Sequence, residues 1–100
     1  MRLIWSPRAV DALAEAVRYI ATENPGAATR WAEGLLEALD RLEHFPRSGR
    51  MVPELGREEY RELLYGDFRV IYRVGSNAGF ILTVVHGRRI LDAHEVVDSP

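Results

Sequence analysis

The order of apolar and polar positions predicts a strand and two helices in the first half of the chain. The apolar stretch 2–5 ends at Ser6-Pro7, where serine can cap a helix and proline fits its first turn. Apolar residues then recur at helical spacing as far as Glu23. Asn24-Pro25 repeats the cap-and-proline signal before a second periodic run that ends near His44. So short a connection predicts an antiparallel helical hairpin.

The second half of the chain changes to a period of two. After a connecting loop over 45–59, alternating residues predict strands over 60–65, 68–74 and 80–86, with Gly66-Asp67 as the turn of the first hairpin. The last dozen residues fit either a short edge strand or a frayed helix. We therefore predict an α+β fold, in which an N-terminal strand and a helical hairpin pack on a small antiparallel sheet, as one domain of residues 1–100.

Alternation along the strands also predicts which side chains lie under the helices. The positions expected on the helix side are Phe68, Val70, Tyr72, Val74, Leu82 and Val84. The positions expected on the outer face are Arg69, Ile71, Arg73, Thr83 and Val85, and we consider the case in which Arg61 and Leu63 share that face. An outer face of this kind would be cationic with apolar patches, which suits a binding surface better than a plain solvent-facing one.

Composition excludes several classes of function. The chain has 100 residues and no cysteine, so disulfides, thiolate metal sites and cysteine catalysis are excluded. Its serines lie outside any nucleophile-elbow motif, and its three histidines have no metal-site spacing. There is no phosphate-binding glycine loop, because Gly66, Gly75, Gly79 and Gly87 are explained as turn residues. We expect no metal and no cofactor. Pro7 interrupts the N-terminus and no apolar run could span a membrane, so we expect a cytoplasmic protein.

Charge is distributed unevenly although the net charge is only -2. All basic residues are arginines, and they recur between Tyr60 and Arg89, whereas the tail is acidic. The group 86–89, His-Gly-Arg-Arg, could combine with Arg61 and Arg69 to hold and cleave a phosphodiester, with His86 titrating near neutrality. The plainer alternative is that His86 satisfies hydrogen-bonding groups at the edge of the sheet, and that Arg88 and Arg89 dock an antitoxin or face water.

Over roughly residues 2–90 the chain resembles toxins of the RelE/ParE superfamily of type II toxin–antitoxin systems. The most specific pieces are the strand Phe68-Arg69-Val70-Ile71-Tyr72, the loop Phe45-Pro46-Arg47-Ser48-Gly49-Arg50 and the ending His86-Gly87-Arg88-Arg89. The resemblance implies a helical hairpin on a four-stranded antiparallel sheet. It also implies a cognate antitoxin whose extended segment wraps the toxin, docking in an apolar groove between helices and sheet.

Two activities occur in that superfamily. RelE-like members cleave messenger RNA on the ribosome, and ParE-like members poison DNA gyrase. In the RelE-like pattern two lysines lie two positions apart on the strand before the hairpin turn. Here these positions are Arg61 and Leu63, so one of the two cations is kept. The next arginine is present as Arg69, but no aromatic residue follows Phe80, so the C-terminal tyrosine is missing.

The opening of the first helix at 6–9 and the His-Gly-Arg-Arg ending look more like ParE. We therefore expect a gyrase inhibitor without catalytic residues of its own, and keep a metal-independent endoribonuclease acting with the ribosome as the alternative. In that alternative the catalytic set would be Arg61, Arg69, His86 and Arg89. The residues expected to bind the target or the antitoxin are Arg61, Arg69, Arg73, Arg88 and Arg89. An unrelated structural module is a third interpretation.

Overall fold

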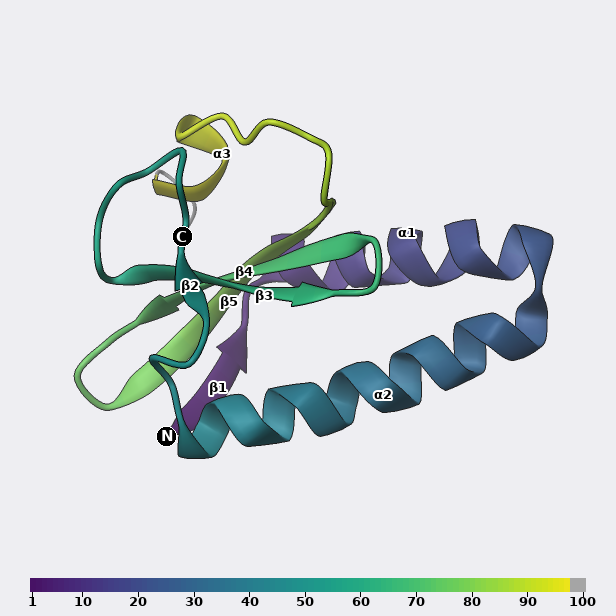
Figure 1. Ribbon diagram of the computed structural model, residues 1–100, viewed down its shortest axis with the longest axis horizontal. Coiled ribbons are helices and arrows are strands. Elements are labelled where there is room, and N and C mark those ends of the chain that lie inside the picture. Colours follow the sequence, from purple (N-terminus) through teal and green to yellow (C-terminus); the bar gives the residue numbers. More distant parts are fainter. Residues whose placement is uncertain (98–100) are drawn as a thin grey trace.

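The computed structural model describes residues 1–97 and places a helical hairpin against one face of a sheet (Figure 1). The long helices are α1 (Pro7–Glu23) and α2 (Pro25–His44). The strands are β1 (Arg2–Trp5), β2 (Arg50–Met51), β3 (Tyr60–Tyr65), β4 (Phe68–Val74) and β5 (Ala78–His86), and a short helix α3 (His94–Val97) follows them. The predicted α+β class, the helical hairpin and the three central strands are confirmed.

Capping side chains set the helix starts where the sequence predicts them. The Ser6 hydroxyl accepts a hydrogen bond from the Ala9 amide at 3.0 Å, and Asn24 Oδ1 accepts one from the Ala27 amide at 3.1 Å. Asn24 also ends α1, because its own amide donates to the carbonyl of Ile20. A single residue therefore joins the two helices and caps both.

The sheet has five strands in the order β1-β5-β4-β3-β2 and is mixed. The four-stranded, wholly antiparallel sheet that the resemblance implies is therefore wrong in two respects. β1 pairs with β5 in parallel, although the helical hairpin and strands β2, β3 and β4 all lie between them in the chain. β2 is a two-residue strand inside the predicted loop.

A main core fills the space between the helices and the sheet. Its buried members are Ala9, Leu35, Leu39, Leu42, Val70, Tyr72, Ile81 and Val84. Phe68 and Val74 pack against them, so four of the alternating positions of β4 lie on the helix side as predicted.

A second apolar cluster lies on the outer face of the sheet. Its buried members are Val52, Tyr60, Ile71, Leu82, Val85, Leu91 and Val96. The loop after β2 and the segment after β5 supply the residues that cover this face. Residues 87–97 thus form a segment that covers the outer face and ends in α3, and we call it the covering segment. Residues 98–100 lie outside the described part.

Three predicted side-chain directions are wrong. Arg61 and Leu63 stand opposite Tyr72 and Val70, so both point to the helix side. The two-residue turn at Gly66-Asp67 sets this register, because it pairs Tyr65 with Phe68. Leu82 packs in the outer cluster because the β4–β5 register shifts between Ile71 and Tyr72, which inverts the alternation at that point. Thr83 and Val85 keep the outer positions predicted for them.

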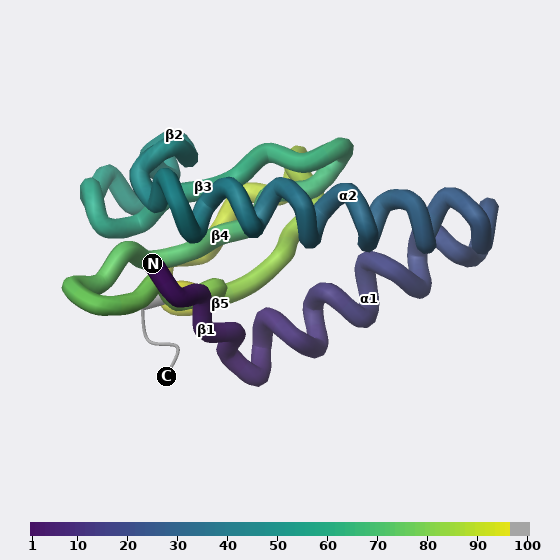
Figure 2. The backbone as a smooth tube through the Cα atoms, turned by 90° about the horizontal axis from the view of Figure 1, so that it is seen from below, coloured from purple at the N-terminus to yellow at the C-terminus, as the bar shows by residue number. Residues whose placement is uncertain are grey.

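The helical hairpin is longer than the sheet that it covers. Figures 1 and 2 both show the α1–α2 connection projecting past the β3–β4 turn. Within residues 1–97, none of the helices has the length and apolar content needed to cross a bilayer.

Candidate functional site

Arg69 lies at the centre of a buried ionic cluster on the outer face of the sheet. The residue is 4% exposed, and its guanidinium donates to both carboxylate oxygens of Glu54, to Oε1 of Glu62 and to the backbone oxygen of Arg89. Glu62, which is 1% exposed, also accepts from Nε of Arg50 at 2.5 Å. These contacts engage every N–H of the Arg69 guanidinium. Arg69 has no donor left for a phosphate or for a partner's carboxylate.

The cluster fastens the covering segment to the sheet. Glu54 Oε2 accepts a hydrogen bond from the Leu91 amide at 2.9 Å, and Nη1 of Arg69 donates to the carbonyl of Arg89 at 3.0 Å. The backbone of the covering segment is therefore held from two sides by charged side chains, which make stronger hydrogen bonds than neutral groups do. The position of the residues around Arg89 depends on this cluster.

The ion pair changes the ionisation of both partners. Hydrogen bonds from Arg69 lower the pKa of the Glu54 carboxyl from 4.5 to about 2, against the opposing effect of burial. The hydrogen bonds to Glu54 raise the pKa of the Arg69 guanidinium above its ordinary value. Because the folded-state pKa of Glu54 lies below its ordinary value, its contribution to stability is present above about pH 4.5 and is lost as the pH falls through about 2.

Acid denaturation should therefore distinguish the chain from a Glu54→Gln variant. At neutral pH we expect the original chain to be more stable by about 1 kcal/mol, a value reduced for the partial exposure of this carboxylate. The difference should shrink as the pH falls from 4.5 to 2, as measured by urea denaturation at a series of pH values. Glu58→Gln, at an exposed carboxylate, is the control. A stability difference that stays constant across this range would contradict the assignment.

The other residues expected at the site are spread over the molecule. Arg61 lies on the opposite face of the sheet from Arg69 and donates to the carbonyls of Glu58 and Gly49, at 2.8 and 3.3 Å. Arg73 stacks over the ring of Phe80, with 4.5 Å between its guanidinium carbon and the ring centroid. Neither guanidinium points to the cluster around Arg69, so the expected cationic face is not a single patch.

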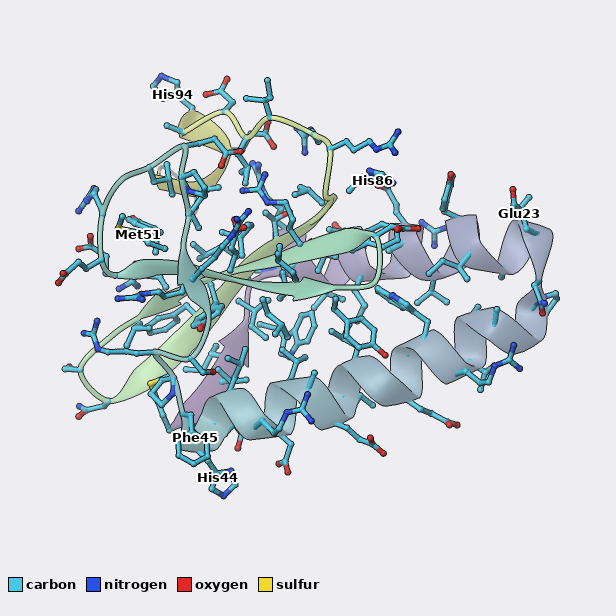
Figure 3. The ribbon with its side chains drawn as sticks, viewed as in Figure 1. Glu23, His44, Phe45, Met51, His86 and His94 are labelled. Atoms are coloured by element: carbon cyan, nitrogen blue, oxygen red, sulfur yellow. The ribbon has the colours of Figure 1, made fainter. Side chains whose placement is uncertain are left out.

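The residues at the end of β5 do lie together. His86 Nδ1 accepts from the amide of Arg88 at 3.3 Å, and the imidazole packs edge-on against Phe68 with 5.6 Å between ring centroids. Arg89 pairs with Glu95 of α3. Arg88 is exposed, and its guanidinium has no ion pair within residues 1–97. Figure 3 shows His86 far from both His44 and His94.

An aromatic hollow adjoins His86, near the end of the helical hairpin where Asn24 connects α1 to α2. It has a volume of about 360 Å³ and lies between the helices, which supply Tyr19 and Trp31, and the β3–β4 turn, which supplies Phe68. Trp31 and Phe68 pack edge to face with 5.3 Å between ring centroids, and Tyr19 is 67% exposed. The indole N–H of Trp31 is buried without a hydrogen-bond partner in the described chain, an unusual state for a polar group.

The two glutamates of the cluster and the aromatic hollow were not predicted from the sequence. Glu62 lies on the same face of β3 as Tyr60, two residues before it, and a charge at such a buried position signals a buried ion pair. Tyr19 and Trp31 lie within the two predicted helices, but helical periodicity does not indicate what their rings contact. No local pattern connects them with Phe68, because three separate elements supply the three rings.

The comparisons with known proteins agree with this geometry. The sequence profile described as "ParE toxin of type II toxin-antitoxin system, parDE" matches residues 3–91. A protein of Sinorhizobium fredii named "Putative toxin Y4kP" is 36% identical over 91 residues, which are 88% of this chain and 90% of that protein. A chain of a solved structure, "Chromosomal ParDE TA system from P. aeruginosa", superposes with a TM-score of 0.69 at 21% identity, covering 86% of this chain and 95% of its own, and so shares the fold. This chain therefore belongs to the ParE toxin family of type II toxin–antitoxin systems.

Proposed function

We propose that the chain is a toxin that stops growth by poisoning DNA gyrase, acts as a binding protein rather than as a nuclease, and is silenced by a cognate antitoxin. One observation carries the choice of target. Arg61 and Arg69, the two cations that a RelE-like nuclease would direct at one phosphate, lie on opposite faces of the sheet, and Arg69 is fully engaged by glutamates. The proposal places the protein in the cytoplasm, where gyrase acts.

Cleavage of RNA requires a base, an acid and cations that converge on one phosphate. At the end of β5, His86 and Arg88 lie together with donors free for a ligand, but Arg61 and Arg69 lie elsewhere, which supports a binding protein rather than a nuclease. Inhibition of gyrase needs a contact surface instead. The exposed guanidinium of Arg88 beside the aromatic hollow is the surface that we propose for that contact.

The antitoxin is the proposed partner of the groove between helices and sheet. The aromatic hollow offers exposed apolar surface from Tyr19 and Phe68 and an unpaired indole N–H from Trp31. An apolar side chain next to a backbone carbonyl of the partner would fill the hollow and satisfy that donor. This supports the docking of an amphipathic segment at the place where the resemblance predicts it.

Ribosome-dependent cleavage of messenger RNA remains the second candidate, and His86 is the observation that favours it. Its Nδ1 accepts a hydrogen bond, so in the neutral imidazole Nε2 carries the proton and can donate to a phosphate. An Arg61→Ala, His86→Ala double variant separates the two functions. A nuclease should lose activity by about 100-fold or more.

The double variant should still arrest growth when it is induced in cells and should still trap cleaved DNA. An Arg88→Ala variant, made at an exposed side chain, should fold normally and inhibit more weakly. Primer extension on abundant messages, run on the same cultures, reports the competing activity. Growth arrest that disappears in the double variant together with cut messages would overturn the gyrase proposal.

A further inference from the structure

The second half of β5 has a free edge. β1 pairs with β5 only from Ala78 to Ile81, because the chain leaves the sheet at Ser6 to begin α1. Beyond that point β5 has one neighbouring strand, β4. The stretch from Thr83 to His86 therefore presents one side of its backbone to no other strand among the described residues.

The hydrogen-bond pattern identifies the groups that point to this free edge. The amide of Gly87 donates to the carbonyl of Asp67 at 2.7 Å, in line with the β4–β5 ladder. In an antiparallel ladder, residues alternate between those that exchange hydrogen bonds with the partner strand and those that point away from it. Counting back from Gly87, Thr83 and Val85 bond to β4, whereas Val84 and His86 point outward.

Val84 makes this arrangement unusual. It is 6% exposed, and within residues 1–97 its outward amide and carbonyl have no backbone partner. A backbone group that is shielded from bulk water without a partner is costly, and proteins rarely retain one. The outward groups of Val84 thus require water or a bound chain.

A continuous groove runs along this edge. Two adjoining hollows, of about 570 and 340 Å³, share Ala12, Glu15, Val84 and Arg89 in their walls. The second of them reaches Phe68 and His86, next to the aromatic hollow. α1 forms one wall, and Arg89 with Glu95 of the covering segment forms the other.

The α1 wall carries two carboxylates at a useful spacing. Asp11 and Glu15 are exposed, and neither has an ion pair in the described part of the chain. Residues four apart on a helix are about 6 Å apart along its axis. Residues two apart on a strand are about 6.6 Å apart and lie on the same face. Two basic side chains of an extended segment would therefore face Asp11 and Glu15 together.

We propose that an extended segment of the antitoxin adds to the free edge of β5, in line with β1, and directs two basic residues, two positions apart, at Asp11 and Glu15. This inference rests on the proposed antitoxin partnership and specifies its geometry. Main-chain hydrogen bonds to the amide and carbonyl of Val84 and to the amide of His86 supply binding that is independent of sequence, whereas the carbonyl of His86 already accepts from the Arg89 amide at 3.0 Å. The two carboxylates select the charge pattern.

The probe is a capped six-residue peptide of alternating valine and lysine, compared with one of alternating valine and glutamate. Binding is followed by amide chemical shifts and by hydrogen exchange. We expect the lysine peptide to shift and protect the amides of Val84 and His86, and the glutamate peptide to bind about tenfold more weakly or less. An Asp11→Lys, Glu15→Lys variant should reverse this preference. A Glu33→Lys, Glu37→Lys variant, with the same spacing on the exposed face of α2, should leave it unchanged.

Backbone methylation separates strand addition from simple charge attraction. The amides of alternate residues in a strand point to opposite sides, so a peptide N-methylated at its valines and one N-methylated at its lysines block opposite edges. Only one of the two should lose binding. Equal binding of both, or shifts away from β5, would overturn the inference. Inhibition of gyrase by the same protein is measured without any peptide. A failure of peptide binding therefore leaves the proposed inhibition of gyrase untouched, and the two failures can be distinguished.

Discussion

An Arg69→Ala variant is expected to lose about 3–5 kcal/mol of folding free energy. The substitution would take from Glu62, which is 1% exposed in the original chain, the more buried of its two arginine partners, and would release Glu54 from the same guanidinium. Removal of one partner from a buried ion pair costs this much because the remaining charge stays desolvated. Urea denaturation gives the loss directly. Hydrogen exchange at Leu91, whose amide bonds to Glu54, should show the covering segment loosening as well.

Two further variants make the Arg69 result specific. Arg88→Ala removes an exposed guanidinium that forms no ion pair in the described chain and should change stability by less than about 0.5 kcal/mol. Adding Glu62→Gln to Arg69→Ala should restore part of the loss, because the buried charge is then gone. An Arg69→Ala protein as stable as the original would show that the cluster does not hold the fold.

A Gly49→Ala variant is expected to destabilise the chain by about 2–3 kcal/mol. A methyl group at this position would lie 2.4 Å from the Tyr72 hydroxyl and 2.7 Å from the backbone oxygen of Glu62. Tyr72 is fully buried and is fixed by hydrogen bonds from the Gly49 amide and to the carbonyl of Pro46, at 3.1 and 2.8 Å. Neither the ring nor the strand backbone can move aside without disturbing the core. Thermal and urea unfolding measure the effect.

Gly26→Ala is the matched control. Gly26 lies in the first turn of α2, and an added methyl group would approach only the flexible end of Arg30, at 3.3 Å, and Asn24, at 3.4 Å. Alanine is the better helix former by about 1 kcal/mol, so this variant should be as stable as the original or slightly more stable. Equal losses at Gly49 and Gly26 would mean that crowding against Tyr72 is not the cause.

The helices and the central strands could be predicted from the sequence because capping residues and the spacing of apolar residues act over short stretches of the chain. The serine–proline and asparagine–proline pairs marked both helix starts, and each polar side chain makes the capping bond expected of it. Strand alternation was equally readable along β4, where Val70 and Tyr72 are buried under the helices.

Nonlocal features could not be predicted in the same way. The bulge that turns Leu82 outward has no proline or glycine to mark it. The pairing of β1 with β5 joins two segments that are far apart in the sequence. The role of Arg69 depends on Glu54, which lies in a loop without periodicity. An arginine that the sequence suggested for binding therefore holds the fold together, and only the tertiary structure shows the difference.

Supercoiling by purified gyrase should be measured with and without this protein, together with cleaved DNA in the same reactions and with ribosome-bound messenger RNA incubated in parallel. If the protein poisons gyrase, supercoiling is lost, cleaved DNA is trapped and the message stays intact, and the Arg61→Ala, His86→Ala variant gives the same result. Message cut on the ribosome, with gyrase unaffected and the cleavage lost in that variant, would contradict this proposal.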